Sequence, residues 1–403
     1  MASKDWVSAE KQDKNSDQID VPNLSFGNKS YTKLSFGDLY DIKNGINKSK
    51  EYFGKGNKIL NYMDVNKSVK NDENSIKGLI QISDEEYERY NVQNNDLFFT
   101  RTSETSEEIG LTSAYIGNSE KCIFSGFILR ARPIKEFINS LYFAYYLRSP
   151  KMRNEIIKLS SITTRALISG KNLSTLNVKI PDINEQEKVA NFLSLVDKKI
   201  ELMERKRNTL YTYKKSVMQQ IFSKKIKFNI EKNSNCCCEK KLGDICEITT
   251  GKLDANAMCI NGKYRFYTCS ETYYYIDNYE FDDDALLISG NGAHVGYIHH
   301  YKGKFNAYQR TYVLLRFNED IMYVYYFLEK FLKRRIEQEK NIGNTPYITL
   351  NTLKNMVIQV PSLNGQKKIA DFLSKIDNKL DSVEQQLEKI KEFKKYLLQQ
   401  MFV

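Results

Sequence analysis

The three histidines are the residues of this chain best suited to acid–base or nucleophilic chemistry. His294, His299 and His300 lie within one short segment, in a region that also contains acidic residues. A histidine that activates a nucleophile needs a serine or cysteine held on a sharp turn, and no such sequence accompanies these three. The acidic run Asp282–Asp284 offers ligands for a divalent ion, but runs of this kind are usually solvated turns. Neither group predicts a reaction.

Seven cysteines could form disulfides or bind zinc. Their odd number and irregular spacing argue against a disulfide framework. Cys236, Cys237 and Cys238 are consecutive in a polar, lysine-rich stretch, but the chain has no Cys-x-x-Cys pair. Because the histidines also lie far along the sequence, free thiols are a better interpretation than a zinc site. We expect no metal in this chain.

Motifs of common nucleic-acid enzymes are also missing from the sequence. The six prolines are never adjacent, which excludes the Asn/Asp-Pro-Pro-aromatic element of adenine methyltransferases. No Gly-Lys pair precedes Ser or Thr, so there is no Walker phosphate loop. Pro181-Asp182 resembles the start of a nuclease motif, but no acidic-x-Lys follows in register. We predict that the chain is not itself an enzyme.

The elements that must position any binding residues occur twice. The segment 181–222 returns at 361–402, 180 residues later, with 16 identities in 42 aligned pairs. PDINEQEKVANFLSLVDKKI corresponds to PSLNGQKKIADFLSKIDNKL, and KKSVMQQIF corresponds to KKYLLQQMF. A repeat of this length indicates two copies of one unit, a variable block followed by a long helix.

Both repeated segments have the heptad pattern of a coiled coil. Apolar residues recur at steps of three and four, and no Pro or Gly interrupts them. The pattern favours antiparallel pairing of the two helices over packing of each helix on its own domain. Tyr213 and Phe393 continue the pattern. The residues expected to pair the helices are Val189, Leu193, Val196, Ile200, Met203, Leu210, Val217, Ile369, Leu373, Ile376, Leu380, Val383, Leu387, Ile390 and Leu397.

The two variable blocks share an outline in sequence. KLSFGDLYDIKNG corresponds to KLGDICEITTG, and NNDLFFTRTSET corresponds to DDALLISGNGAHVG. Runs rich in Ile, Val, Phe and Tyr between turn residues predict mostly antiparallel strands. Tyr-rich runs at 141–148 and 323–332 predict one helix per block.

The predicted fold class is therefore mixed α/β (α+β), with two similar domains separated by two long helices that form an antiparallel coiled coil with pseudo-twofold symmetry. The expected boundaries are an N-terminal tail at 1–30, domains at 31–180 and 242–360, repeated helices at 181–222 and 361–403, and a basic linker at 223–241.

Composition points to a polyanionic partner and an intracellular location. The net charge is +11 and the pI is about 9.0, although the segment 242–360 is close to neutral, so any basic surface there must be gathered on one face. No run approaches the roughly 18 apolar residues of a membrane span. The N-terminal residues lack the apolar core of a secretory signal. We expect a cytoplasmic protein that does not bind a membrane.

The sequence resembles one known family over nearly its whole length. The motif P-x-x-x-x-Q-x-K-[VI]-A-x-F-L-S-x-[VI]-D, followed by a helix ending in K-K-x-x-[VL]-[ML]-Q-Q-[IM]-F, closes both blocks. Together with KLGDI at Lys241 and the run LLISGNG, this motif is similar to the DNA-specificity subunit of type I restriction–modification systems. The first block departs from the pattern with TRTSETSEEIG, where family members often have a shorter, glycine-richer turn.

The resemblance implies a non-catalytic subunit that binds double-stranded DNA. Each block would be a target-recognition domain that reads one half of an interrupted sequence, and the helices would be the spacer and dock for two adenine methyltransferase subunits. The resemblance also allows two restriction subunits with translocase and nuclease activity. The chain would carry no cofactor, since S-adenosylmethionine, ATP and Mg would belong to these partners.

Two other functions remain open at the level of sequence. One is a non-catalytic coiled-coil adaptor that does not read DNA, which would lack salt-dependent DNA affinity. The other is a nuclease or methylase with an unrecognised site, which would be active alone with a metal or methyl donor.

Base-contacting residues are expected on loops that carry Arg, Asn, Gln, Lys, Ser or Thr, whereas tyrosines lie more often in cores. For Gln309 and Arg310, a hydrogen bond or ion pair at a strand edge is an equally good interpretation. Replacing Arg165 by Ala should weaken recognition of one half-site only. The candidates in the first block are Arg101, Thr102, Ser103, Thr105, Thr163, Thr164, Arg165 and Lys171. Those in the second block are Ser289, Asn291, His294, Gln309, Arg310, Asn344 and Thr345.

Overall fold

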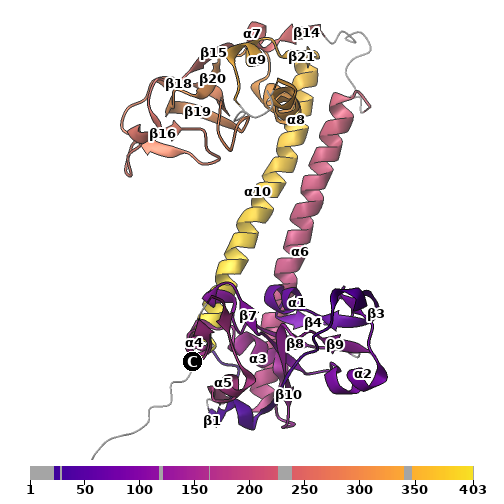
Figure 1. The fold of residues 1–403 in the computed structure, drawn as a ribbon. Helices are drawn as coiled ribbons and strands as arrows, with labels where there is room; N and C mark the ends of the chain where they lie inside the picture. The colour runs from indigo at the N-terminus through magenta and orange to yellow at the C-terminus, as the bar shows by residue number, and fades with distance from the viewer. Residues whose placement is uncertain are drawn as a thin grey trace, which may run out of the picture. The chain divides into compact units, whose positions relative to one another are not determined.

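The computed structural model describes residues 22–27, 30–117, 121–162, 164–225, 238–339 and 347–402 (Figure 1). The chain divides into two compact units. Unit 1 is Met1–Leu202 together with Leu387–Val403, and unit 2 is Met203–Gln386. The long helices α6 (Ile183–Phe222) and α10 (Leu363–Gln400) therefore each contribute residues to both units.

Unit 1 is built around a five-stranded sheet in the order β2-β10-β6-β8-β4. All neighbours are antiparallel except β4 and β8, which are parallel. Side chains of β6 alternate between two cores: Leu97 and Phe99 face one that includes α3, and Phe98 faces the other. Burial on both faces explains why Leu97, Phe98 and Phe99 form a continuous apolar run. The strands are β2 (Tyr40–Asn44), β10 (Ile128–Pro133), β6 (Leu97–Thr100), β8 (Thr112–Tyr115) and β4 (Lys70–Asn71).

Unit 2 repeats this arrangement in a six-stranded sheet ordered β15-β20-β18-β19-β16-β17. Again the fifth strand is parallel to the fourth, here β16 beside β19. The alternation recurs as well, because Leu286 and Ile288 face the core that includes α8 while Leu287 faces the opposite one. The sequence repeat thus extends from the helices into the sheets. The strands are β15 (Glu247–Thr250), β20 (Thr311–Leu315), β18 (Phe281–Ser289), β19 (Ile298–Ala307), β16 (Tyr264–Tyr267) and β17 (Tyr274–Ile276).

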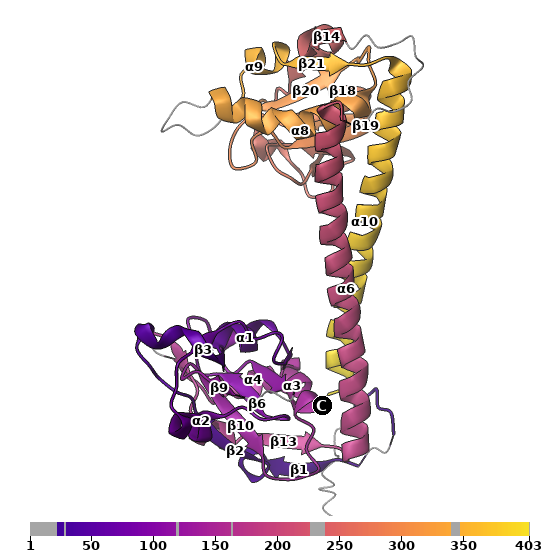
Figure 2. The ribbon, with the colours of Figure 1, turned by 90° about the vertical axis from the view of Figure 1, so that its right-hand side faces the viewer.

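Each long helix is entered from a small antiparallel sheet. In unit 1, β1 (Thr32–Ser35) pairs with β13 (Asn177–Ile180), and Figure 2 shows this pair beside the start of α6. In unit 2, β14 (Cys238–Lys241) pairs with β21 (Val357–Val360), which leads into α10. Pro181 and Pro361 follow β13 and β21, where a proline suits the turn before a helix.

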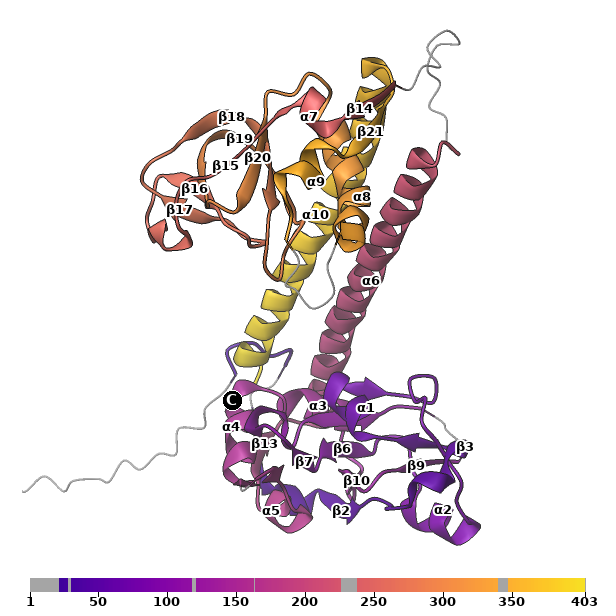
Figure 3. The same ribbon diagram turned by 45° about the horizontal axis from the view of Figure 1, so that its top comes forward.

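The tyrosine-rich runs form the predicted helices, but their lengths differ. In unit 2 the run belongs to α8 (Ile321–Glu339), which lies beside α10 (Figure 3). In unit 1 it forms α3 (Ser140–Tyr146), all of which is buried. Pro150 then begins a separate helix, α4 (Pro150–Lys158), because a proline is favoured in the first helical turn and disfavours helical geometry at the residue before it.

Within each unit the two long helices pair through the predicted apolar seam. Val189, Leu193 and Val196 are buried in the core of unit 1, where Leu397 joins them. Ile369, Leu373 and Ile376 are buried in the core of unit 2, where Val217 joins them. These cores also contain α3 and α8, so the start of each helix packs on its own domain as well as on the other helix. The remaining pairing residues, Ile200, Met203, Leu210, Leu380, Val383, Leu387 and Ile390, are buried or half-buried.

Two positions of the seam were predicted wrongly. Tyr213 and Phe393 are 49% and 47% exposed. The next residue in each helix, Lys214 and Lys394, turns inward instead and finds a carboxylate there. A pattern built from apolar residues alone cannot identify a lysine that turns inward. The mixed α/β class, with two similar domains and two long helices, is otherwise as predicted.

Shorter elements complete the two units. In unit 1 they are η1 (Phe36–Asp38), η2 (Lys50–Tyr52), β3 (Phe53–Leu60), α1 (Tyr62–Lys67), β5 (Leu79–Ile80), α2 (Asp84–Tyr90), β7 (Thr102–Ser103), η3 (Ser106–Glu108), β9 (Cys122–Phe124), β11 (Ser161–Ile162), β12 (Ala166–Leu167) and α5 (Gly170–Ser174). In unit 2 they are α7 (Leu242–Ile245), η4 (Ala255–Ala257) and α9 (Leu350–Lys354). Within the described ranges, no helix combines the length and apolar character that a membrane crossing needs.

Candidate nucleic-acid interface

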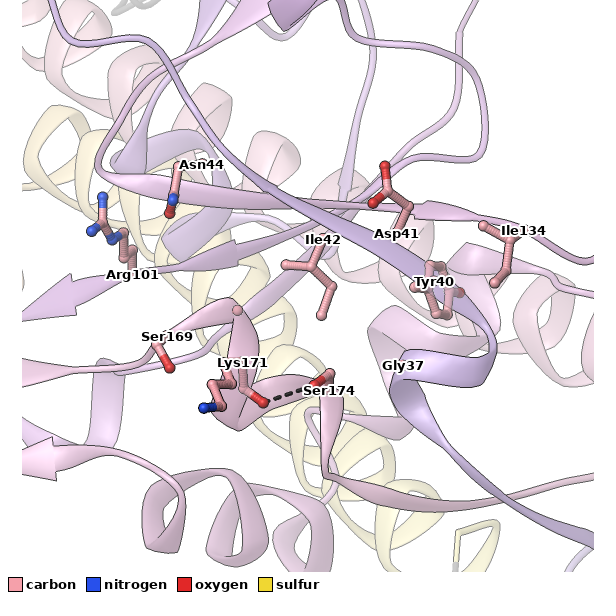
Figure 4. Close-up of a pocket in the computed structure, with 11 residues that line it drawn as sticks. Gly37, Tyr40, Asp41, Ile42, Asn44, Arg101, Ile134, Ser169, Lys171 and Ser174 are labelled. Atoms are coloured by element: carbon pink, nitrogen blue, oxygen red, sulfur yellow. Dashed lines mark hydrogen bonds between the residues drawn. The ribbon is translucent and has the colours of Figure 1, made fainter.

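A cavity of about 740 Å³ lies in unit 1 between β2, the end of β6 and the short helix α5 (Figure 4). Arg101, the residue after β6, and Asn44, at the end of β2, lie toward one end of it. Lys171 reaches it from α5, and Asp41 lies toward the end that Ile134 lines. The cavity thus combines two cations, a carboxylate and an amide, which are the groups that hydrogen-bond to base edges and phosphates.

A second cavity, of about 480 Å³, lies in unit 2. It is lined by residues at the ends of strands β15 and β18, by the turn before β20, and by the residues just before α9. Its polar residues include Asn291, Gln309 and Arg310, and Tyr347 adds an aromatic ring that is 59% exposed.

The two cavities occupy the same place in the repeat. The backbone N–H of Ile168 donates to the carbonyl of Arg101 at 3.0 Å. The backbone N–H of Ile348, 180 residues later, donates to the carbonyl of Gly290 at 2.8 Å. The backbone N–H of Arg101 in turn donates to the carbonyl of Phe127 at 3.0 Å, and the backbone N–H of Gly290 donates to the carbonyl of Arg310 at 2.9 Å. Because the hydrogen bonds match, Arg101 and Gly290 occupy equivalent positions in the two units, and so do Phe127 and Arg310. We call this shared set of backbone positions the common framework.

A glycine at the end of the first strand shapes each framework. Gly45 follows β2, and a Cβ there would overlap the carbonyl oxygen of Ser125. Gly251 follows β15, and a Cβ there would overlap the carbonyl oxygen of Ala307. The close approach of two backbone segments leaves no room for a side chain at either position. The residues just before these glycines, Asn44 and Thr250, both line a cavity.

The free hydrogen-bonding capacity differs between the two cavities. In unit 1, Nη1 of Arg101 donates to the carbonyl of Gly126 at 3.3 Å, which leaves most of its fork of donors available, and the Lys171 side chain is exposed. In unit 2, Nε2 of Gln309 donates to Asp254 Oδ1 at 2.7 Å, which leaves the amide oxygen as an acceptor. The Arg310 side chain is exposed and makes no hydrogen bond or ion pair with other described residues.

Other candidates lie on the loops around the cavities. Thr105 is exposed on the loop after β7, and Thr164 and Arg165 are exposed in the turn between β11 and β12. Thr102 is half-buried and its backbone pairs with Leu167. His294 lies on the loop after β18, where its Nδ1 is 3.2 Å from Glu271 Oε1.

Two candidates are corrected by the structure. The side chains of Ser103 and Ser289 are 5% and 0% exposed, so neither presents its hydroxyl to a bound molecule. Both lie in strands whose side chains at these points face the interior. Thr163, Asn344 and Thr345 lie outside the described residues, as do Cys236 and Cys237. Elsewhere, no group of three His, Cys, Asp or Glu side chains is placed to hold a metal, and Cys238 and Cys246 are free thiols.

A half-buried arginine holds the loop that follows Arg101. Nη2 of Arg153, on α4, donates to the carbonyl of Glu107 at 3.1 Å and also to that of Ile109. Burial lowers the pKa of Arg153 to about 10, so it stays charged at neutral pH. Gly110 follows with a φ of +62°, a conformation that favours glycine. The loop TRTSETSEEIG is therefore fixed at its C-terminal end by a charged donor.

An aromatic and basic cluster covers part of the sheet edge in unit 2. The Arg265 guanidinium lies 4.2 Å from the ring centre of Tyr273 and 4.5 Å from that of Tyr301. On β17, Tyr274 and Tyr275 are 38% and 43% exposed. Rings held in this way can stack on bases or sugars, although most of the tyrosines of α3 and α8 are core residues.

Comparison with known proteins identifies the family. The model of the type I restriction modification DNA specificity domain matches residues 28–212 and 238–392. The chain belongs to this family. It is a type I specificity subunit, and sequence-specific DNA recognition in a restriction–modification system is its role.

Relatives of this specificity subunit differ in how much they share with it. The EcoDI specificity subunit of Escherichia coli is 37% identical over 151 residues, which cover 37% of this chain and 33% of that protein. A putative type I specificity subunit of Mycoplasma genitalium is 24% identical, covering 95% of this chain and 96% of the relative. The chain thus spans about a third of the first relative and nearly all of the second.

Solved structures share the fold of this specificity subunit. A crystal structure of a type I S subunit from M. genitalium superposes with a TM-score of 0.68 at 18% identity, covering 95% of this chain and 99% of that one. A chain from a structure described as showing the assembly and conformational transition of a type I system gives 0.54 at 14% identity, covering 92% and 97%.

Sequence reasoning about this specificity subunit missed several residues that line the cavities. Asp41 and Asn44 in unit 1, and Thr250 and Tyr347 in unit 2, were not among the candidates. A signal was available, since aligning KLSFGDLYDIKNG with KLGDICEITTG places Asn44 beside Thr250, each just before a glycine. Two polar residues at one position of a repeated framework could have been chosen on that ground.

Proposed function

We propose that each cavity, with the loops around it, contacts one half of an interrupted double-stranded DNA target. One observation carries this proposal: the same framework occurs twice, but different side chains line the two copies. A common framework would place both sets of side chains against DNA in the same manner. Different side chains in it would select different bases, which suits a target with two unlike halves.

The chemistry of each cavity suggests the bases it favours. An arginine that keeps two unoccupied N–H donors can donate two hydrogen bonds to O6 and N7 of guanine. Arg101 and Arg310 are both suited to this contact. The amide oxygen of Gln309 would accept a hydrogen bond from an exocyclic amino group, since one N–H of the same amide donates to Asp254 and orients it.

We propose that the paired helices act as spacer and as dock for two adenine methyltransferase subunits, and that two restriction subunits can join. The absence of catalytic motifs from the sequence supports a non-catalytic role for this chain. S-adenosylmethionine, ATP and Mg²⁺ would then be bound by the partners.

The test is to co-express the chain with its methyltransferase partner and to sequence the host DNA for methylated adenine. We expect one interrupted motif with two unlike halves, present only when this chain is expressed. A stable complex that adds no methylation would contradict the proposal and favour the adaptor function. Activity of the purified chain alone with a metal or methyl donor would contradict the non-catalytic role.

A further inference from the structure

Each unit directs one lysine of the paired helices inward, against an aspartate of the opposite helix; Lys214 is buried and Lys394 is half-buried. In unit 1, Nζ of Lys394 lies 2.5 Å from Oδ1 of Asp197. In unit 2, Nζ of Lys214 lies 2.8 Å from Oδ1 of Asp377. Both lysines and both aspartates are 180 residues apart, the interval of the sequence repeat. The two ion pairs are therefore one feature that occurs twice.

A tyrosine of each domain joins the same aspartate. The hydroxyl of Tyr145, on α3, donates to Oδ2 of Asp197 at 2.8 Å. The hydroxyl of Tyr326, on α8, donates to Oδ2 of Asp377 at 2.7 Å. The lysines also lie over the tyrosine rings, 5.7 Å from the ring centre in unit 1 and 5.2 Å in unit 2. We call these groups the helix triads: Tyr145–Asp197–Lys394 and Tyr326–Asp377–Lys214.

The surroundings favour the charged form of Lys214 and the neutral form of both tyrosines. Burial would lower the pKa of Lys214, but Glu329 and Asp377 raise it above its usual value. Burial and the adjacent aspartate raise the pKa of Tyr145, as they do that of Tyr326, so both hydroxyls remain donors. In unit 2 Lys214 also contacts Glu329 of α8, at 2.9 Å.

A triad restricts the positions of the helices and the domain more closely than an apolar contact in the same place would. Apolar side chains tolerate small rotations and shifts, and a buried ion pair is often no more stabilising than the apolar residues that could replace it. Its distinctive property is directional, because the ion pair and the tyrosine hydrogen bond form together only when helix and domain place all three side chains next to one another. Each aspartate receives one hydrogen bond from the domain and one contact from the opposite helix. It therefore sets the register of the helices and the position of the domain on them together.

We propose that the helix triads are positioning residues that restrict the enzyme complex to a single gap length between the two half-sites. This inference rests on the proposed reading of an interrupted target. With a triad broken, the domain could rotate or shift on its helices, and targets with a neighbouring gap length would become substrates. Recognition of the bases themselves would be unchanged, because the cavities contain no triad residue.

The test uses the full-length chain in complex with its methyltransferase partner and a set of DNA targets that differ only in gap length. We expect the wild-type complex to prefer one gap over its neighbours by about tenfold or more, as for a mismatched base pair. Lys394→Met, which keeps the apolar stem and removes the charge, should reduce this preference to about threefold or less. Lys394→Arg should restore it.

The controls separate positioning from stability. Lys395 is the exposed neighbour of Lys394, so Lys395→Met should keep the wild-type preference. An unchanged preference in Lys394→Met, or an equal loss of methylation at every gap, would refute the role of the triads. If Lys394→Met does not assemble, Tyr145→Phe provides the same comparison. Failure of the wild-type complex to recognise any interrupted target would refute the proposed function instead.

Discussion

At the residue scale, the two cavities obtain an arginine from different positions of one framework. Arg101 occupies the position of Gly290, whereas Arg310 occupies the position of Phe127, whose ring is 62% exposed. In the proposed reading of DNA, a guanidinium would therefore approach the bases from the end of β6 in unit 1 and from the turn before β20 in unit 2. The same framework would in this way direct a group suited to guanine to different bases of the two proposed half-sites.

Replacing Arg310 by Ala should impair one half-site and spare the other. The loss of a bidentate base contact costs about 1–3 kcal/mol, or about 5- to 150-fold in discrimination at one base pair. Arg101→Ala should produce the same effect on the other half-site. Methylation rates on targets with single substitutions in each half would show this. Lys333→Ala, an exposed change on α8, is the control, and an equal loss on both halves would contradict the assignment.

The stability of unit 2 should fall in mild acid because of His299. Burial lowers the pKa of His299. The hydrogen bond between its Nε2 and the carbonyl of Ser270, at 2.8 Å, raises the pKa but is the smaller effect. Below about pH 6.5 the unfolded chain therefore binds a proton at this histidine more readily than the folded chain does. The free energy of unfolding then falls as the pH falls, by at most about 1.4 kcal/mol per pH unit. Thermal melts from pH 7 to 5 should show a smaller decline for His299→Asn than for wild type. His294→Asn, an exposed change, should behave as wild type does.

The residues that sequence reasoning found and missed have physical explanations. Arg101, Lys171, Asn291, Gln309 and Arg310 do line the cavities, because polar residues at strand ends are rarely buried. Ser103 and Ser289 were chosen because they too are polar residues at strand ends. A serine side chain is small enough to be buried there, and both are buried. Loop composition does not distinguish these cases, because burial depends on contacts with segments distant in the sequence.

At the element scale, one glutamine attaches each long helix to its domain. The Oε1 of Gln186 accepts the N–H of Asn139 at 3.0 Å, and that of Gln366 accepts the N–H of Asp320 at 2.9 Å. Their Nε2 atoms donate to the carbonyls of Pro181 and Pro361, at 3.0 and 2.8 Å. Both side chains are fully buried. This contact explains why the motif that opens both helices contains Gln at this position.

Replacing Gln366 by Leu should destabilise unit 2. Leucine has a similar size but leaves the N–H of Asp320 and the carbonyl of Pro361 without their partner, at a cost of about 1–3 kcal/mol for each such group. The melting temperature of the purified complex should fall by several degrees. Gln386→Leu, at an exposed position of the same helix, is the matched control. Equal melting temperatures for the two variants would show that Gln366 is not required.

The helices themselves were predictable, but their internal polar contacts were not. Heptad spacing identified the seam because apolar residues recur along both segments. It selected Tyr213 and Phe393 as the next apolar residues, although the helix presents Lys214 and Lys394 inward at this level. A lysine is buried only with its charge satisfied, and its partner lies on another helix far away in the sequence.

At the scale of the whole molecule, the positive charge should govern affinity more than selectivity. A net charge of +11 attracts DNA through phosphates, which carry no direct sequence information. The affinity of the assembled complex for its target should therefore fall about a thousandfold between 50 and 200 mM salt, as expected for six or more phosphate contacts.

Binding measured across this salt range would test the expectation. Arg310→Ala should lower affinity for the target without changing the slope against salt, since its proposed contact is with a base. A complex whose DNA affinity does not depend on salt would support the adaptor function.

The way in which the helices are shared between the units has a consequence for synthesis of the chain. Leu397, Met401 and Phe402 complete the core of unit 1, and the ring of Phe402 packs against Tyr142 and Tyr146. The ribosome must translate every residue of unit 2 before it reaches them. The domain that emerges first is therefore the one that finishes folding last. A premature stop codon shortly after Gln386 would damage this earlier domain and leave the later one with all of its residues.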